Sequence, residues 1–308
     1  MNRVIAHTGA RYPILQAPMG WIARTPLASA VSSAGGLGII ETSSGETEIC
    51  QAEIVKMRAL GLPFGVNLPI RFLRDDQMLR FVCASGVKFV TTSAGSPAKF
   101  IAPLKDAGIT VYHAVPTLDA ALKCVEAGID GLVVEGAEGG GFKNPQPVST
   151  MVLLPLVRSK VKVPIIAAGG FLDGASMVAA FALGAEGIQL GTRMVSAKES
   201  PVHENWKNAI VNAKETDTVF LNRFHSPALR ALRTERTSRL EKSPEVNAMT
   251  EFGVAKELYF GGDMEAAIPL TGQVAGRIDS VRPVAEIIAE IRNEFESTLR
   301  NLGRQYLG

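Results

Sequence analysis

Short aliphatic runs recur along the first two thirds of the chain, eight in all, about two to three dozen residues apart. They span residues 13–18, 36–40, 64–68, 88–92, 110–115, 131–136, 164–169 and 187–192. Each run is apolar without strict alternation, which is typical of parallel strands buried on both faces. Between them lie helix-like stretches that often end in glycine, the residue that stops helices in the left-handed conformation. Eight such units predict a TIM (β/α)₈ barrel, whose usual length is about 250 residues.

A doubly wound sheet is the alternative architecture. Its dinucleotide-binding fingerprint would follow the first strand, where this chain instead reads QAPMGWIARTP (16–26). We therefore favour the closed barrel.

The pattern changes after the eighth run. Residues 196–280 are polar and charged, and residues 203–215 and 226–242 have helical character. We predict that residues 1–195 and 281–308 form the barrel, with an apolar helical stripe in the last segment. Residues 196–280 are then a helical extension after strand eight, or a lid over the barrel mouth.

Charge and cysteine content narrow the kind of partner. The 308 residues carry 32 basic and 30 acidic side chains, a net charge of +2, with no long run of like charges. We therefore expect neither nucleic acid nor an anionic membrane as a partner. We expect a small-molecule substrate instead. The three cysteines lack CxxC spacing, so no metal site is predicted. No apolar span has membrane length, and we expect a cytoplasmic protein.

Two glycine-rich segments lie where a barrel binds phosphate. In this fold the active site is at the C-terminal ends of the strands, and phosphate binds after strands seven and eight. Gly169 and Gly170 follow the seventh run, and Gly191 and Thr192 follow the eighth. Their amides, with the start of the next helix, would bind a phosphate without a lysine. Tight turns alone would also explain the glycines, but their occurrence at both expected strand ends favours a phosphate site.

Six motifs together resemble the nitronate monooxygenase family, formerly called 2-nitropropane dioxygenases. They are QAPMG (16–20), FGVNL (64–68), VVEGAEGGG (133–141), PIIAAGGFLDG (164–174), GAEGIQLGTRMVSAKES (184–200) and TGQVAG (271–276). That family also includes FMN-dependent enoyl-acyl carrier protein reductases and related quinone reductases. The resemblance covers nearly the whole chain in the right order, and it implies FMN bound at the barrel mouth.

The resemblance also implies roles for individual residues. Ala17, Pro18 and Met19 would lie along the isoalloxazine ring, and Asn67 would hydrogen-bond its polar edge. The phosphate would be held by Gly169, Gly170, Gly191 and Thr192, with Gln189 nearby.

Phe142 is the departure from the family pattern. In the best-known members a histidine follows the glycines and is assigned acid-base or substrate-positioning work. Phenylalanine cannot exchange a proton, and losing a positioned acid-base group typically costs about 100-fold to 10,000-fold. A reaction that begins by deprotonating a neutral nitroalkane should then be slow. Oxidation of a nitronate, and hydride transfer from NAD(P)H, need no such base.

His113, in the fifth run, is the candidate substitute for that histidine. It reaches the mouth if its side chain points inward, and strand alternation leaves this direction open; the alternative is a histidine packed outward under a helix. Lys143 is expected to be a solvated loop charge rather than a substrate-facing cation. Glu138 is expected to orient the glycine loop through backbone N–H groups rather than to take a proton.

The resemblance, taken with these residues, implies three possible functions. The first is FMN-dependent oxidation of alkyl nitronates by oxygen to a carbonyl compound and nitrite. The second is an FMN-dependent reductase that takes electrons from NAD(P)H, as a transient donor, and passes them to an enoyl thioester or quinone. The third is a flavin-binding protein without turnover. The sequence leaves open whether the protein forms a homodimer.

Overall fold

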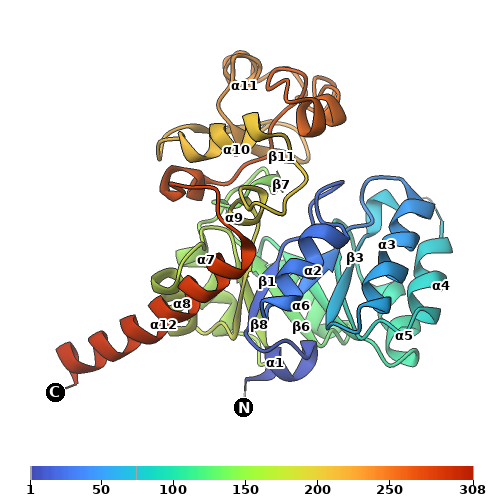
Figure 1. Ribbon diagram of the computed structural model, residues 1–308. Helices are drawn as coiled ribbons and strands as arrows, with labels where there is room; N and C mark the ends of the chain where they lie inside the picture. The colour runs from blue at the N-terminus through green and yellow to red at the C-terminus, as the bar shows by residue number, and fades with distance from the viewer. Residues whose placement is uncertain (1, 74, 308) are drawn as a thin grey trace.

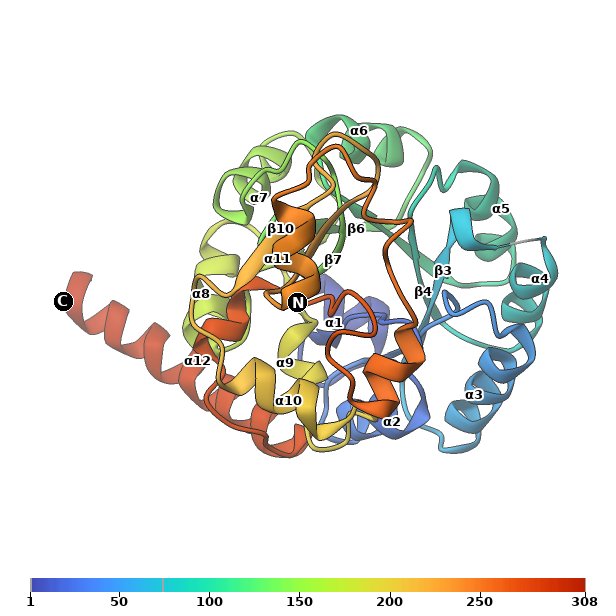
Figure 2. The ribbon, with the colours of Figure 1, turned by 90° about the horizontal axis from the view of Figure 1, so that it is seen from above.

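The computed structural model describes residues 2–73 and 75–307, and within these ranges eight parallel strands form a barrel (Figures 1 and 2). The strands are β1 (Ile14–Gln16), β2 (Gly38–Ile40), β3 (Phe64–Pro69), β4 (Phe89–Ser93), β5 (Thr110–Val115), β6 (Gly131–Glu135), β8 (Ile165–Ala168) and β9 (Gly187–Leu190). Their order is β1-β9-β8-β6-β5-β4-β3-β2, and a bridge between Leu15 and Leu37 joins the first to the last. The eight predicted strands and the TIM-barrel fold are confirmed.

Strand alternation divides the core into two layers. Leu15, Ile39, Phe89, Tyr112 and Val133 belong to a cluster inside the barrel. Apolar residues next to them in the sequence belong to a larger cluster between the strands and the helices: Ile14, Ile40, Val90, Val111, Leu132 and Val134. This burial on both faces explains why the runs are apolar without alternating with polar residues.

A ring of helices surrounds the strands (Figure 2). It contains α2 (Thr25–Ser33), α3 (Thr47–Ala59), α4 (Gln77–Ala84), α5 (Ala98–Asp106), α6 (Leu118–Glu126), α7 (Thr150–Arg158), α8 (Gly174–Ala182) and α12 (Val284–Tyr306). The first turns of α12 bury Val284, Ile287, Ile288 and Ile291. The helix packs on α8 and α2, and its C-terminal half extends away from the barrel (Figure 1).

The N-terminal helix α1 (Arg3–Thr8) closes the end of the barrel where the strands begin. Val4 of this helix is fully buried in the inner cluster. The hydroxyl of Tyr112 lies 3.0 Å from Nδ1 of His7, and the two rings meet edge to face. We call this end the floor, and the opposite end, where the strands finish, the mouth.

Residues 196–280 lie over the mouth (Figures 1 and 2). The chain passes from α9 (Thr192–Val195) through α10 (Glu204–Val211), β10 (Thr218–Leu221), β11 (Ala228–Leu232) and α11 (Glu235–Glu241) to two short turns, η2 (Glu257–Gly261) and η3 (Gln273–Arg277). The predicted helix at 203–215 is confirmed by α10.

The predicted helix at 226–242 is wrong in its first half. Residues 228–232 form β11, which pairs antiparallel with β10 and with β7 (Gly141–Lys143), so the extension is mixed rather than purely helical. Leu229 and Ala231 are fully buried in a separate small core. Pairing and burial therefore override the helix propensity of this Leu-, Ala- and Arg-rich stretch.

Candidate functional site

Three neighbouring strands bring most of the predicted cofactor residues together at the mouth. Ala17, Pro18 and Met19 follow β1, and the loops with Gly191 and Gly169 follow β9 and β8, the next two strands of the sheet. The amide of Ala17 donates to the carbonyl of Leu190 at 2.9 Å. A Cβ on Gly191 would lie 3.8 Å from the Cβ of Ala17. The QAPMG and QLGT motifs are thus in contact.

Gly169 and Gly170 adopt φ values of +84° and +92°, which L side chains rarely adopt. A Cβ on Gly169 would lie 2.8 Å from the carbonyl oxygen of Gly136, so the turn packs tightly on the loop after β6. Within the described residues, the amides of Gly170 and Phe171 donate to no protein acceptor. The turn therefore has a structural role and also leaves backbone donors for an anion.

The start of α8 does not contribute to the phosphate site as predicted. The Asp173 carboxylate accepts from the amide of Ser176 at 2.8 Å, and Glu294 accepts from the amide of Gly174 at 2.8 Å. These acidic groups occupy the positive end of the helix, where a phosphate would otherwise be favoured. The expectation that the first turn of α8 binds phosphate is wrong, and any anion site is confined to the preceding loop.

Two buried polar groups near the mouth lack protein partners. Gln189 alternates with Ile188 and Leu190, which face the helices, so its side chain faces the barrel interior. Its Oε1 and the indole Nε1 of Trp21 are buried with no hydrogen-bond partner among the described residues. Such groups are rare in native structures because they lose solvation without compensation. They are the expected result where a polar ligand completes the site.

Asn67 lies on the inner face near the end of β3 and is buried. Its Oδ1 accepts from the Thr91 hydroxyl at 3.0 Å, which fixes the amide, while Nδ2 has only a 3.4 Å contact with the Ser93 hydroxyl. Together with Gln189 and the amides after β8, this amide offers the donors and acceptors that a flavin ring and its phosphate require. The residues present therefore fit FMN.

Thr192 and the TGQ segment hold the loops of the mouth together. Thr192 Oγ1 accepts from the amide of Gly272 at 2.8 Å and retains its own proton for donation. The carbonyl of Glu138 accepts from the amide of Gln273 at 2.9 Å. A Cβ on Gly140 would lie 2.7 Å from the nitrogen of Gly272, so this approach requires glycine.

The side chain of Glu138 braces the glycine loop. Its carboxylate accepts from the amide of Thr150 at 3.0 Å and from the Thr150 hydroxyl at 2.9 Å. Glu138 thus ties the loop to the start of α7 as expected, but the donors are the amide and hydroxyl of Thr150 rather than the amides of the neighbouring glycines.

Phe142 is half-exposed and stacks on Phe72, which follows β3 in the short turn η1 (Ile70–Phe72). The exposed fractions are 40% for Phe142 and 43% for Phe72, and the ring centroids lie 5.7 Å apart at an interplanar angle of 25°. Position 142, where the resemblance led us to expect a histidine, is thus part of an apolar rim. Sequence reasoning did not identify Phe72, because the two rings are 70 residues apart in the chain.

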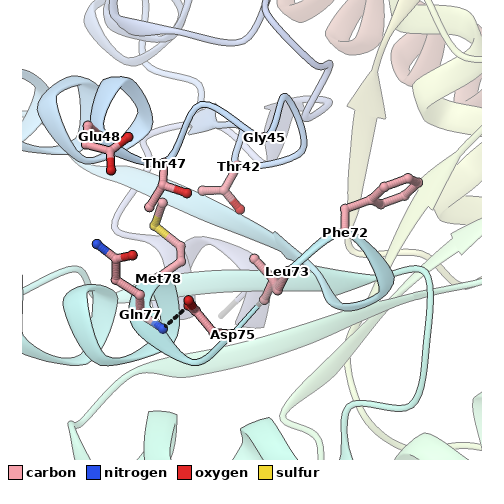
Figure 3. A pocket seen from close by; sticks show the side chains of 9 residues that line it. All are labelled: Thr42, Gly45, Thr47, Glu48, Phe72, Leu73, Asp75, Gln77 and Met78. Carbon is pink, nitrogen blue, oxygen red and sulfur yellow. Dashed lines mark hydrogen bonds between the residues drawn. The ribbon is translucent and has the colours of Figure 1, made fainter.

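A cavity of about 240 Å³ lies beside Phe72, between the loops that follow β2 and β3 (Figure 3). Its lining residues are Thr42, Gly45, Thr47, Glu48, Phe72, Leu73, Asp75, Gln77 and Met78. The Phe72 ring points away from the other labelled side chains, at one end of the cavity (Figure 3). The cavity and the aromatic rim are therefore adjoining parts of the mouth.

His113 does not reach the mouth. It alternates with Tyr112 and Ala114, which contact the inner cluster, so its ring faces the helix layer. The Thr92 hydroxyl lies 2.7 Å from its Nδ1. Burial lowers the pKa of His113 to about 4, against an opposing hydrogen bond with the Gly95 backbone. The interpretation of His113 as a substitute for the missing histidine is therefore wrong.

Lys143 is also not where it was expected. Its side chain is only 5% exposed, and its ammonium pairs with the carboxylate of Glu135 at the end of β6. Glu135 lies in register with Ala168, a member of the inner cluster, so the carboxylate faces the interior of the mouth. The signal in the sequence was the alternation from Val133 to Glu135, which places an acid on the inner face.

The fold and the position of these polar groups define a (β/α)₈ barrel enzyme that binds its ligands at the C-terminal ends of its strands. The family model described as nitronate monooxygenase matches residues 2–73 and 70–294. The chain belongs to the nitronate monooxygenase family and is an oxidoreductase, and FMN is the cofactor typical of this family.

Individual relatives have different names. A Mycobacterium tuberculosis protein named (3aS,4S,5R,7aS)-5-hydroxy-7a-methyl-1-oxo-octahydro-1H-indene-4-carboxyl-CoA dehydrogenase is 35% identical, with 92% of each chain covered. The structure of FabK from Thermotoga maritima has a TM-score of 0.94 and 37% identity over 99% of both chains. The structure of nitroalkane oxidase from Streptomyces ansochromogenes has a TM-score of 0.84 and 25% identity, covering 97% of this chain and 99% of that one.

Residues 2–73 and 75–307 contain neither a membrane-spanning helix nor a metal-binding cluster. No helix there is both long enough and apolar enough to cross a bilayer. No group of three or more His, Cys, Asp or Glu side chains there is arranged to hold a metal ion.

Proposed function

We propose that this protein is an FMN-dependent reductase that uses NAD(P)H to reduce the C=C bond of an enoyl thioester. The observation that carries the proposal is Phe142 stacked on Phe72; the resemblance to the family leads us to expect a histidine at position 142. With His113 facing the helices, no histidine of the described barrel strands points into the mouth. Chemistry that requires a strong base to start is therefore disfavoured.

Without a histidine base from the strands, reduction of the enoyl thioester is favoured over the reverse dehydrogenation. When bound, FMN supplies hydride transfer between NAD(P)H and the substrate. Reduction adds hydride to the β-carbon of the enoyl group, and the α-carbon then only needs a proton. The reverse reaction would require removal of a weakly acidic α-proton, a step that depends on a positioned base. Reduction is thus better suited to this mouth than dehydrogenation or oxidation of a neutral nitroalkane.

The aromatic rim and its adjoining cavity support an extended acyl thioester as the substrate. Two half-exposed aromatic rings provide an apolar surface for an acyl chain. The cavity beside Phe72 would receive the part of the substrate farthest from the reacting carbons. The name of the Mycobacterium tuberculosis relative specifies a carboxyl-CoA, which is a thioester of this kind.

The segment 196–280 would act as the lid of this site. Strand β11 of this segment pairs with β7, and Leu229 lies opposite Phe142. A movement of the segment would therefore also move Phe142. Its covering position would exclude water during hydride transfer.

Nitronate oxidation is the second candidate, and Phe142 favours it too, because a nitronate is already deprotonated. The likeness to nitroalkane oxidase supports this alternative at lower identity than the likeness to FabK.

The test is a comparison of substrates with the flavin-loaded protein. Consumption of NADH or NADPH that depends on crotonyl-CoA and yields butyryl-CoA supports the reductase. Oxygen consumption with propyl nitronate that exceeds thioester reduction, with release of nitrite, would replace it with the second candidate.

A further inference from the structure

The C-terminal half of α12 carries an apolar stripe that the barrel does not cover. We propose that this stripe packs on the outer faces of α7 and α8 of a second copy of the chain, and that the exchange is reciprocal in a symmetric dimer. The inference does not depend on the proposed function. It assigns residues 296–306, the part of α12 that we call the overhang, as a dimerisation element.

The stripe is one continuous row along α12. Its residues are four, four, three and four positions apart, which places them on one face of the helix. They are Ile291, Phe295, Leu299, Leu302 and Tyr306. Ile291 is buried, and Phe295 meets Phe181 of α8 edge to face, with 5.3 Å between the ring centroids. The last three are 46%, 41% and 71% exposed. The stripe thus begins in the core and continues into solvent.

The crossing of α12 with α8 fixes the direction of the overhang. The amide of Gly174, at the start of α8, donates to the Glu294 carboxylate at 2.8 Å. A Cβ on Gly174 would lie 2.1 Å from the nitrogen of Phe295, so the two backbones are in direct contact. Beyond this crossing the helix continues for about three turns, on the side of the barrel where α7 and α8 lie (Figures 1 and 2). The overhang is therefore presented next to the outer faces of these two helices.

The outer faces of α7 and α8 are apolar as well. Residues 150–157 and 174–182 contain no charged side chain. On α7 the exposed fractions of Met151, Val152 and Leu156 are 68%, 57% and 41%. The exposed residues of α8 are small: Ala175, Ala179 and Ala182. Large side chains beside a row of small ones form a surface into which another helix can pack, and exposed apolar patches mark interaction sites. We call this surface the acceptor face.

A second copy of the chain supplies both halves of such a contact. Each chain presents a stripe and an acceptor face, so reciprocal exchange across a two-fold axis covers both surfaces on both copies. The contact then occurs twice, which brings the buried area toward the roughly 800 Å² per partner of a stable interface. Neither surface includes a charged residue, so the contact buries no unpaired ion. A different partner would have to provide an apolar ridge and an apolar groove in the same arrangement.

The polar face of the overhang does not match an anionic membrane. Helices that lie in a membrane interface are rich in Lys and Arg on that face. In the overhang Arg300 pairs with Glu296 at 3.0 Å, and the sequence adds one further cation, Arg304. A protein surface is therefore the occupant that the charges favour.

Charges placed on either surface test the stripe and the acceptor face separately. Leu302→Lys alters the stripe and Met151→Glu alters the acceptor face, and both side chains are exposed within one chain, so the monomer should still fold. Each change occurs twice in a symmetric dimer and should raise the dimer Kd at least about 100-fold. Val55→Glu is the matched control, because Val55 is 56% exposed on α3, away from both surfaces (Figure 2). Sedimentation velocity at several protein concentrations gives the Kd, and circular dichroism checks the fold.

A mixture of the two variants tests whether the exchange is reciprocal. A dimer of one Leu302→Lys chain and one Met151→Glu chain keeps one original contact and brings the new lysine to the face that carries the new glutamate. We expect the equimolar mixture to dimerise at least about tenfold more tightly than either variant alone. Direct pairing of one overhang with the other would leave Met151→Glu dimeric and would give no such recovery, which overturns the assigned acceptor face.

An original protein that stays monomeric at every concentration overturns the proposal. If that monomer binds vesicles of phosphatidylcholine and phosphatidylglycerol, the stripe belongs to a membrane surface instead. A dimer that survives both substitutions also overturns the proposal, because its contact then lies elsewhere. If Met151→Glu does not fold, Val152→Glu tests the same face.

Discussion

The floor and the mouth of the barrel differ in how their polar groups are paired. At the floor, Tyr112 meets His7, and Asp130 accepts from the amide of Val111 at 2.9 Å while pairing with Lys105. At the mouth, Gln189 and Trp21 keep buried atoms without partners. Among the residues that the structure describes, the buried side-chain atoms without a partner lie at the mouth and none lies at the floor.

Backbone strain is distributed in the same way. Trp21 and Ala94, with φ of 60° and 54°, follow β1 and β4 at the mouth. Such conformations typically cost about 1–3 kcal/mol for residues other than glycine and tend to cluster at functional sites. We infer that the floor of this barrel serves mainly stability and that the mouth serves its chemistry.

The largest expected effect comes from filling the phosphate turn. Gly170→Asp adds a side chain and a negative charge where backbone amides are free, and we expect retained FMN to fall at least about tenfold. The matched control is Gly108→Asp, at an exposed floor turn with φ of +71° and nothing within 4 Å of the new Cβ. FMN content is measured by absorbance after denaturation. Equal FMN content in the two variants would refute the phosphate assignment.

Placing a histidine at position 142 should change substrate preference. The original protein should consume propyl nitronate faster than neutral nitropropane, because Phe142 supplies no base. Phe142→His should raise turnover of the neutral form by about 100-fold. Phe72→His is the control, since it places the same imidazole on the other ring of the stack. Similar nitropropane rates in the original protein and in Phe142→His would show that position 142 does not govern proton removal.

The pH dependence of the unfolding free energy tests the position of His113 in the helix layer. Its pKa is about 4 in the fold and about 6.5 when unfolded, so the unfolded chain binds more protons between these values. Stability is then full above pH 6.5 and falls as pH decreases toward 4, by roughly 2 kcal/mol at pH 5. Urea unfolding from pH 7 to pH 5 measures this loss. His113→Gln should remove that part of the slope; an unchanged slope would mean that His113 is not the group responsible.

The smallest effect is expected at the floor. Tyr112→Phe removes the hydroxyl that meets His7 and should cost about 1 kcal/mol of unfolding free energy. FMN content and turnover should not change, because the hydroxyl lies at the opposite end of the barrel from the cofactor. A loss of FMN in this variant would contradict the separation of the two ends.

The barrel could be predicted from sequence because burial on both faces leaves a repeated local signal. The small sheet of β7, β10 and β11 could not, because β11 is defined by distant partners rather than by its own composition. For the same reason, the sequence did not determine whether the His113 side chain points into the barrel or toward the helices. It also hid the pairing of Lys143 with Glu135, which depends on how a loop folds back onto a strand.

Among the predicted site residues, those carried by short motifs came together: Ala17, Gly169, Gly170 and Gly191 all lie on the three strand ends β1, β8 and β9. The motifs identified the backbone that a cofactor approaches. They did not identify Phe72 as the partner of Phe142, because that contact is set by the tertiary structure.

The most direct measurement is an anaerobic spectrum of the purified protein during successive additions. We expect a flavin absorption band that NADH or NADPH bleaches and that crotonyl-CoA restores, with one butyryl-CoA formed for each flavin reoxidised. A colourless protein that takes up no FMN would contradict the account of the mouth. A flavin that crotonyl-CoA leaves bleached, but that oxygen and propyl nitronate turn over, would contradict the proposed reductase.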